Sequence, residues 1–265
     1  MLKHFTEKKL RGHKRLSSVE QFKNPPVQEA LLDIQVTLPA ETTLNVLRKF
    51  QAGLEARFPE RQERISLQQG FQISGAGDSQ AITSSRSVDG YWFVAKADGK
   101  IVQARRDGFT FNKLRPYSNW DTFSAEAKEL WQRYVEIAKP ANVRRIGLRY
   151  LNRIEIPLPF RDFREFCLLF PDLPPKIPQA LTEFFLRFAV PVESVPAAAA
   201  SVTLTFEPPQ QAATLPLILD IDAFQSFEML SPDTEEIWKR LAVLRGLKND
   251  IFDASLTDKT KAMFR

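Results

Sequence analysis

The chain has 265 residues, of which 43% are hydrophobic and 21 are phenylalanine, enough for one large domain or two of ordinary size. Both histidines, His4 and His13, lie within the first thirteen residues, Cys167 is the single cysteine, and the formal net charge is +5. The rest of the chain therefore cannot build a Ser-His-Asp or Cys-His catalytic set or a zinc site with the usual ligands, and no internal disulfide can form, which is typical of a reducing cytoplasm.

The excess positive charge lies entirely in the first 24 residues. This stretch holds seven basic and two acidic residues, so the remaining 241 residues are balanced. We interpret residues 1–23 as a solvated, flexible basic leader. The alternatives are that this leader adds attraction to nucleic acid or to an anionic membrane surface. No apolar run has the length of a signal peptide or of a membrane-spanning helix, and we expect a cytoplasmic protein.

The first half of the chain predicts a strand, a helix, a strand meander and a long helix. The prolines of Asn24-Pro25-Pro26 end the leader, because proline is excluded from helix interiors. Hydrophobic periodicity and the turn signals Asp98-Gly99 and Asp107-Gly108 then set the order of elements. We predict a strand over 27–38, a helix from Thr42 or Thr43 to Phe58, strands over 64–74, 91–97, 101–105 and 109–114, and a helix capped by Asn119 that ends before Pro140.

The second half predicts a similar order of elements. Ser231-Pro232-Asp233 supplies a helix cap, a first-turn proline and a first-turn acid for the last helix. We predict a strand over 143–156, a short helix over 160–170, a proline-rich connector, strands over 181–192, 201–206 and 217–227, and a C-terminal helix bearing Ile237, Leu241, Leu244, Ile251 and Phe252.

The repeated order of elements indicates an α+β fold made of two consecutive β-α-β(3–4)-α modules. The first module would cover residues 24–140 and the second residues 141–265, each with a curved antiparallel sheet packed on a long helix. This order is similar to the helix-grip and saddle folds, some of which enclose apolar ligands, while duplicated ones bind DNA. A likeness at the level of the fold carries little information about function.

The densest polar pattern lies on the strand over 143–156. Because side chains alternate along a strand, Arg145, Arg149 and Arg153 share one face, while Tyr150 and Asn152 lie on the opposite, mostly apolar face. Three arginines in a row could bind phosphates or carboxylates as bidentate clamps. The favoured alternative is a ladder of arginines paired with acids on neighbouring strands.

Two acidic residues are the candidate partners of these arginines. Asp220 and Asp222 point to one face of the strand over 217–227. Paired carboxylates can hold Mg²⁺ or act as acid and base, although an ion pair is far commoner. The predicted binding set is therefore Arg145, Arg149, Tyr150, Asn152, Arg153, Asp220 and Asp222, with no catalytic residue, metal ligand or cofactor predicted.

Other features have simpler explanations. The loop Gly75-Ala76-Gly77 does not open a nucleotide-binding helix, and Cys167 is interpreted as a buried small hydrophobic residue. Core packing explains most aromatic residues first, with base stacking or the lining of an apolar cavity as the alternative. The aromatic residues in question are Tyr91, Trp92, Phe93, Phe109, Phe111, Tyr117 and Trp120.

Several segments from residue 24 onward together carry a family resemblance. They include Asn24-Pro25-Pro26-Val27-x-Glu29, the run Arg145-Ile146-Gly147-Leu148-Arg149-Tyr150-Leu151-Asn152-Arg153-Ile154, Leu219-Asp220-Ile221-Asp222 and Leu256-Thr257-Asp258. With these motifs the chain resembles a sporadically distributed family of uncharacterised bacterial proteins of similar length. The resemblance implies no reaction, cofactor or catalytic residue. The patchy distribution of such a family is typical of genes for phage defence or toxin-antitoxin-like systems.

The leading functional hypothesis is a non-enzymatic binding or sensor protein. It would recognise a protein partner or hold a small apolar or anionic ligand, such as a lipid, against curved sheets. The first alternative is nucleic-acid binding through the basic leader and the arginine-bearing strand. The second is a metal-dependent hydrolase that uses Asp220 and Asp222.

Overall fold

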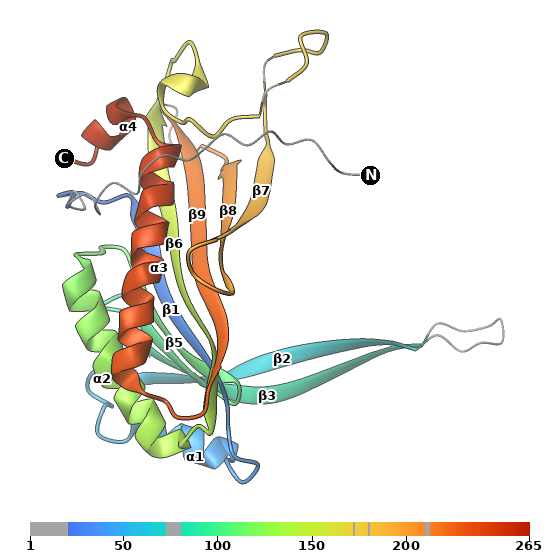
Figure 1. Cartoon of the computed structure of the whole chain (residues 1–265), viewed down its shortest axis with the longest axis vertical. Coiled ribbons are helices and arrows are strands. Elements are labelled where there is room, and N and C mark those ends of the chain that lie inside the picture. The colour runs from blue at the N-terminus through green and yellow to red at the C-terminus, as the bar shows by residue number, and fades with distance from the viewer. Residues whose placement is uncertain (1–20, 73–80, 172, 180, 210–212) are drawn as a thin grey trace.

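The computed structural model describes residues 21–72, 81–171, 173–179, 181–209 and 213–265. Its centre is one antiparallel sheet of nine strands, in the order β2-β3-β4-β5-β1-β6-β9-β8-β7 (Figure 1). The strands are β1 (Val27–Thr37), β2 (Glu60–Gln72), β3 (Ala81–Ala95), β4 (Lys100–Arg105), β5 (Gly108–Leu114), β6 (Asn142–Pro157), β7 (Phe185–Pro191), β8 (Ala198–Phe206) and β9 (Thr214–Met229).

The predicted α+β fold of two helix-packed modules is wrong, because the protein is mostly β and its strands form one continuous sheet. The two halves join where β1 pairs with β6, with Ala30 opposite Tyr150 and Leu32 opposite Leu148. β1 and β6 are thus central strands with a neighbour on each side. The backbone hydrogen bonds between β1 and β6 join the two predicted sheets into one.

The helices are α1 (Leu44–Arg48), α2 (Trp120–Ala138), α3 (Thr234–Ser255) and α4 (Asp258–Ala262). The two long helices, α2 and α3, cover the same face of the sheet (Figure 1). Asn119 caps α2 as predicted, since its side chain accepts a hydrogen bond from the Thr122 amide at 2.9 Å. The cap of α3 is Asp233 and not Ser231, because the Asp233 carboxylate accepts hydrogen bonds from the next turn.

Two predicted helices are much shorter than expected. The helix expected to reach Phe58 consists of α1 and a 3₁₀ turn over Lys49–Gln51, and Gly53, at φ +78°, follows it in the left-handed region. The helix expected over 160–170 is a single 3₁₀ turn over Phe163–Glu165. There the backbone of Cys167 forms an isolated bridge with Leu256, so tertiary hydrogen bonds replace further helical ones.

The buried residues form two apolar clusters on the helix-covered face. One packs α2 and the first half of α3 against β1, β3 to β6, β8 and β9. The other packs the end of α3 and the 163–167 segment against β6, β8 and β9. Along β6, Tyr150 belongs to the first cluster and Ile154 to the second, and Asn152 lies between them. The apolar interior is therefore interrupted at this point of the central strand.

Among the described residues, no helix is both long and apolar enough to cross a lipid bilayer. Cys167 is buried, as predicted, and burial raises the pKa of its thiol to about 11. The glycine loop at residues 75–77 and the first 20 residues of the basic leader lie outside the described residues.

Candidate functional site

The structure divides the seven predicted binding residues between two faces of the sheet. The arginine side chains of β6 and the two aspartates of β9 lie on the face that carries no helix. Tyr150 and Asn152 lie on the opposite face, beneath α3, and both line a cavity. The predicted set therefore does not form one site, and each face has to be considered separately.

On the face without helices, the β6 arginines are paired with carboxylates. Arg149 makes a bidentate contact with Asp220, with Nε to Oδ1 at 2.9 Å and a second nitrogen to Oδ2 at 2.6 Å, and this hydrogen bonding raises the pKa of the guanidinium. Arg153 contacts Glu155 at 2.8 Å and also pairs with Glu207. This pattern is the ladder of ion pairs, the favoured alternative at the sequence level.

Arg145 connects this ladder to a buried network around Asp33. Its guanidinium lies 3.3 Å from Asp33 and 3.3 Å from Asp222, and it lies over the Phe224 ring. Asp33 also accepts hydrogen bonds from Arg105 and Thr110, each at 2.8 Å. The sequence analysis did not single out Asp33, although an acid in the middle of an apolar strand is a usable signal for a buried network.

The network leaves no evident role for the aspartates as metal ligands. Asp222 sits beside Arg145, and burial raises the pKa of its carboxyl while that arginine opposes the change. Within the described part of the chain, no group of three or more His, Cys, Asp or Glu residues could hold a metal ion. No observation on these residues therefore favours the metal-dependent hydrolase.

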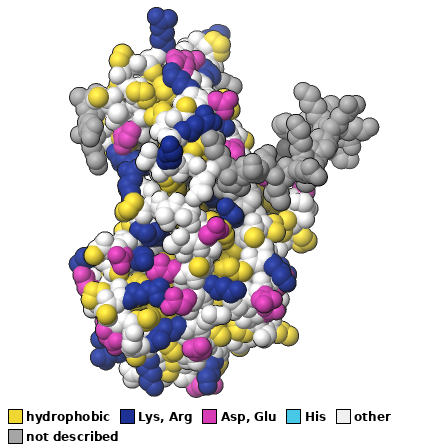
Figure 2. Space-filling model, turned by 90° about the vertical axis from the view of Figure 1, so that its left-hand side faces the viewer, with side chains coloured by type: hydrophobic (Ala, Val, Ile, Leu, Met, Phe, Trp, Pro, Cys, Tyr) yellow, Lys and Arg dark blue, Asp and Glu magenta, His cyan; other side chains and the backbone are white. Residues whose placement is uncertain are grey.

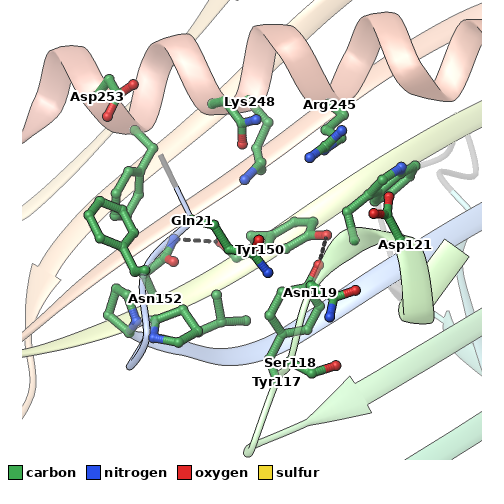
Figure 3. Close-up of a pocket in the computed structure, with 17 residues that line it drawn as sticks. Gln21, Tyr117, Ser118, Asn119, Asp121, Tyr150, Asn152, Arg245, Lys248 and Asp253 are labelled. Atoms are coloured by element: carbon green, nitrogen blue, oxygen red, sulfur yellow. Dashed lines mark hydrogen bonds between the residues drawn. The ribbon is translucent and has the colours of Figure 1, made fainter. Parts of the chain in front are cut away.

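The opposite face contains a cavity of about 170 Å³ at the interruption of the apolar interior. Four parts of the chain form its walls: the segment 21–27, the turn and first residues of α2 at 117–121, strand β6, and the last turns of α3 (Figure 3). The rings of Tyr117, Trp120 and Tyr150 give it an aromatic lining. Tyr117 and Trp120 were among the aromatic residues for which a cavity lining was the alternative to core packing.

A pair of tyrosines forms one wall of this cavity. The hydroxyl oxygens of Tyr117 and Tyr150 lie 2.9 Å apart, and the two rings meet edge to face with centroids 5.5 Å apart. Burial raises the pKa of the Tyr117 hydroxyl to about 12 and that of the Tyr150 hydroxyl well above its usual value. Both hydroxyls therefore keep their protons at neutral pH, and because one of them donates to the other, the pair has one proton left to donate to a further acceptor.

Two cationic side chains extend from α3 into the same cavity. Lys248 Nζ lies 4.1 Å from the centroid of the Tyr150 ring, and Arg245 lies over the Trp120 ring at 5.4 Å (Figure 3). Burial, with a smaller contribution from Arg245, lowers the pKa of the Lys248 amine to about 7, and Asp253 opposes this change. Cationic side chains usually lie near carboxylates, so the acidic residues around Arg245 and Lys248 have to be considered.

Among the described residues, no carboxylate lies within ion-pair distance of Lys248 or Arg245. Two acids, Asp121 and Asp253, lie at the edge of the cavity with exposed side chains, and Asp253 is 3.9 Å from Lys261. Elsewhere on this side of the molecule, basic and acidic side chains are interspersed (Figure 2). The cavity thus combines aromatic walls with two cations that form no ion pair with the part of the chain that the structure describes.

The N-terminus of α2 adds positive potential to the same place. The cavity is lined by Asn119, Trp120 and Asp121, which form the cap and first turn of this 19-residue helix. The aligned peptide dipoles of a helix are equivalent to roughly half a positive charge at its N-terminus. This field favours an anion beside the two α3 cations, although Asp121 reduces it at the edge.

Arg245 and Lys248 were not predicted as site residues, although the sequence contains a signal for Lys248. The buried face of α3 runs through Ile237, Leu241, Leu244 and Phe252, and position 248 continues this helical spacing. A lysine therefore occupies a position where the periodicity expects an apolar residue. Such an interruption in an otherwise apolar stripe marks either a buried polar contact or a cavity.

Comparisons with protein-family models, with curated proteins and with solved structures found no match to this chain. The geometry of the cavity and of the polar face is therefore the basis for inferring a function.

Proposed function

We propose that this protein is a non-enzymatic binding protein, of the sensor type, whose cavity holds a small anion with a flat apolar body. The observation that carries the proposal is the contrast between two sets of cations. Arg145, Arg149 and Arg153 each form an ion pair with a carboxylate, whereas neither Arg245 nor Lys248 forms one with any described residue. A cation that is partly buried without an ion-pair partner is costly, and a bound anion would offset this cost.

The size of the cavity limits the ligand. At about 170 Å³ it is similar to an apolar cavity of roughly 150 Å³ that accepts benzene. A single ring or a short chain with one carboxylate or phosphate group fits this space, and a whole lipid does not. The ring would lie among the aromatic walls, and the acid group would face Arg245, Lys248 and the N-terminus of α2.

The pairing of the β6 arginines also bears on the alternatives. A phosphate backbone would have to compete with the carboxylates that already contact Arg149 and Arg153, so this face offers little to a nucleic acid. A sensor of a small anion would suit the defence role that the family resemblance implies.

We also propose a cytoplasmic location, which the single buried thiol supports.

Binding of benzoate and phenyl phosphate tests the proposal, with benzamide as the neutral analogue. We expect calorimetry to detect both anions and the neutral amide to bind at least tenfold more weakly. Arg245→Gln should weaken benzoate binding by at least tenfold. Arg240→Gln, which changes an arginine on the same helix that pairs with Glu236, should leave it unchanged.

Two results would count against this function. The first is equal binding of benzamide and benzoate, because the cations would then contribute nothing. The second is unchanged benzoate binding in the Arg245→Gln variant. Circular dichroism of each variant shows whether its fold is intact, so a loss of binding through unfolding can be recognised.

A further inference from the structure

The cavity places one primary amine where a ligand can reach it. Lys248 lies on the buried face of α3, its Nζ lies 4.1 Å from the Tyr150 ring centroid, and it is part of the cavity lining (Figure 3). Both lysines of α4 lie next to acids: Lys261 is 3.6 Å from Asp258, and Lys259 contacts Glu165 at 2.5 Å. Within the described residues Lys248 has no such partner.

The surroundings of Lys248 favour the uncharged amine. An aromatic wall does not replace the water that an ammonium group loses on burial, and the Arg245 guanidinium repels a second positive charge. The pKa of the amine is consequently lowered to about 7, so a large fraction is unprotonated at neutral pH. An unprotonated lysine in an apolar pocket beside another cation is the usual arrangement for an amine that attacks carbonyl carbon.

We propose that Lys248 forms a reversible imine with an aldehyde or ketone group carried by the anion that the cavity binds. This inference rests on the proposed function and specifies its ligand as a small oxo acid. Arg245 would hold the acid group, and the carbonyl carbon would lie at Lys248 Nζ. Neighbouring positions three residues apart on a helix face suit a ligand with both groups on one ring or short chain.

The reaction is balanced without any further reagent. The nitrogen lone pair of Lys248 forms a bond to the carbonyl carbon, the carbonyl oxygen takes up a proton, and the nitrogen loses one. The resulting carbinolamine expels its hydroxyl group as water after a second proton transfer, leaving a carbon–nitrogen double bond. Of the Tyr117 and Tyr150 hydroxyls, which are hydrogen-bonded to each other at 2.9 Å, the one that accepts this bond can donate its own proton to that oxygen.

Reductive trapping tests the inference. The full chain is incubated at pH 7.5 with 3-formylbenzoate and cyanoborohydride, which reduces an imine to a stable amine, and the product is mapped by peptide mass spectrometry. We expect one main adduct, on Lys248, formed at least tenfold faster than adducts on the exposed Lys239 of the same helix. Lys248→Arg should lose this adduct and Lys239→Arg should keep it.

Three comparisons decide the outcome. Modification spread evenly over the surface lysines of the wild-type chain would overturn the inference, and this measurement needs no variant. Binding of benzoate with no adduct from 3-formylbenzoate would overturn it while leaving the proposed function intact. Rapid trapping of neutral benzaldehyde on Lys248 without any benzoate binding would overturn both the oxo acid as ligand and the proposed function, because the acid group would then contribute nothing.

Discussion

Replacing Lys248 by methionine should make the protein more stable at neutral pH. Methionine keeps the unbranched chain and fills the same space without a charge. The folded protein lowers the pKa of the amine from 10.5 to about 7, so folding opposes its protonation. Below pH 7 both the folded and the unfolded chain carry the proton, and the full penalty is present. Above pH 10.5 neither does, and the penalty disappears.

The two pKa values set the size of the effect. At about 1.36 kcal/mol for each pH unit, the interval from 10.5 to 7 corresponds to about 5 kcal/mol. Because Lys248 is of intermediate exposure, we discount this figure and expect a gain of about 2–4 kcal/mol at pH 6–7. Between pH 7 and pH 10 the unfolded chain binds more protons than the folded one, so the wild-type protein should gain stability and approach the variant.

Urea denaturation at pH 6, 7, 8.5 and 10 measures this difference. The other charged or titratable groups around the amine are Arg245, Asp253, Asp121, Tyr117 and Tyr150. The tyrosines titrate above this range because burial raises their pKa values. Lys239→Met, on the exposed side of α3, is the control and should show no such pH dependence. A variant less stable than wild type at pH 7, or a difference independent of pH, would refute the reasoning.

Three further predictions concern the sheet. In urea denaturation, Asp33→Asn should lower the free energy of unfolding by about 2–4 kcal/mol, because Arg105 and Arg145 lose the carboxylate that they share. Arg149→Ala should lower it by less than about 1 kcal/mol, because that side chain is half exposed. Gly90→Ala should cost more than about 3 kcal/mol in thermal unfolding, since its Cβ would lie 2.4 Å from the backbone oxygen of Ala104, and near-wild-type stability would show that the strands can separate. In DNA titrations at several salt concentrations, a chain that begins at Asn24 should show no steeply salt-dependent binding, and Arg149→Ala in the full chain should leave any such binding unchanged. A steep salt dependence in the shortened chain would show that the β6 arginines can bind DNA despite their carboxylate partners.

Local geometry was predictable from the sequence where alternation or capping decides it. The period of two along β6 correctly placed Arg145, Arg149 and Arg153 opposite to Tyr150 and Asn152. These features depend on residues that are close in sequence, so periodicity and side-chain chemistry suffice. The individual strands were found for the same reason, although several of their limits differ.

The arrangement of the strands could not be predicted in the same way. Nothing in residues 27–38 indicates that β1 lies between β5 and β6, and this pairing turns two expected sheets into one. The apolar spacing of Phe163, Phe166 and Phe170 is equally compatible with a helix and with a turn followed by backbone pairing. Contacts between residues far apart in sequence decided both cases.

The cavity could be predicted only in parts. Tyr150 and Asn152 were selected for their strand motif, and Tyr117 and Trp120 for their aromatic rings, but no local pattern connects them to α3. The informative residue was Lys248, whose position on an apolar helix stripe needs no knowledge of the fold. A search for single charges within apolar stripes would have found it, whereas a search for clusters of charge selects the paired arginines.

The contrast between the two faces of β6 explains why the cavity, and not the arginine strand, is the better candidate for function. Where the chain needs only stability, it places carboxylates opposite its arginines, as Asp220 does for Arg149. Acids are equally available on α3, yet Asp250 and Asp253 are exposed and neither pairs with Lys248. Since a leucine or methionine at position 248 would continue the apolar stripe without an electrostatic cost, stability alone does not account for the lysine. A ligand that contributes the missing negative charge does account for it.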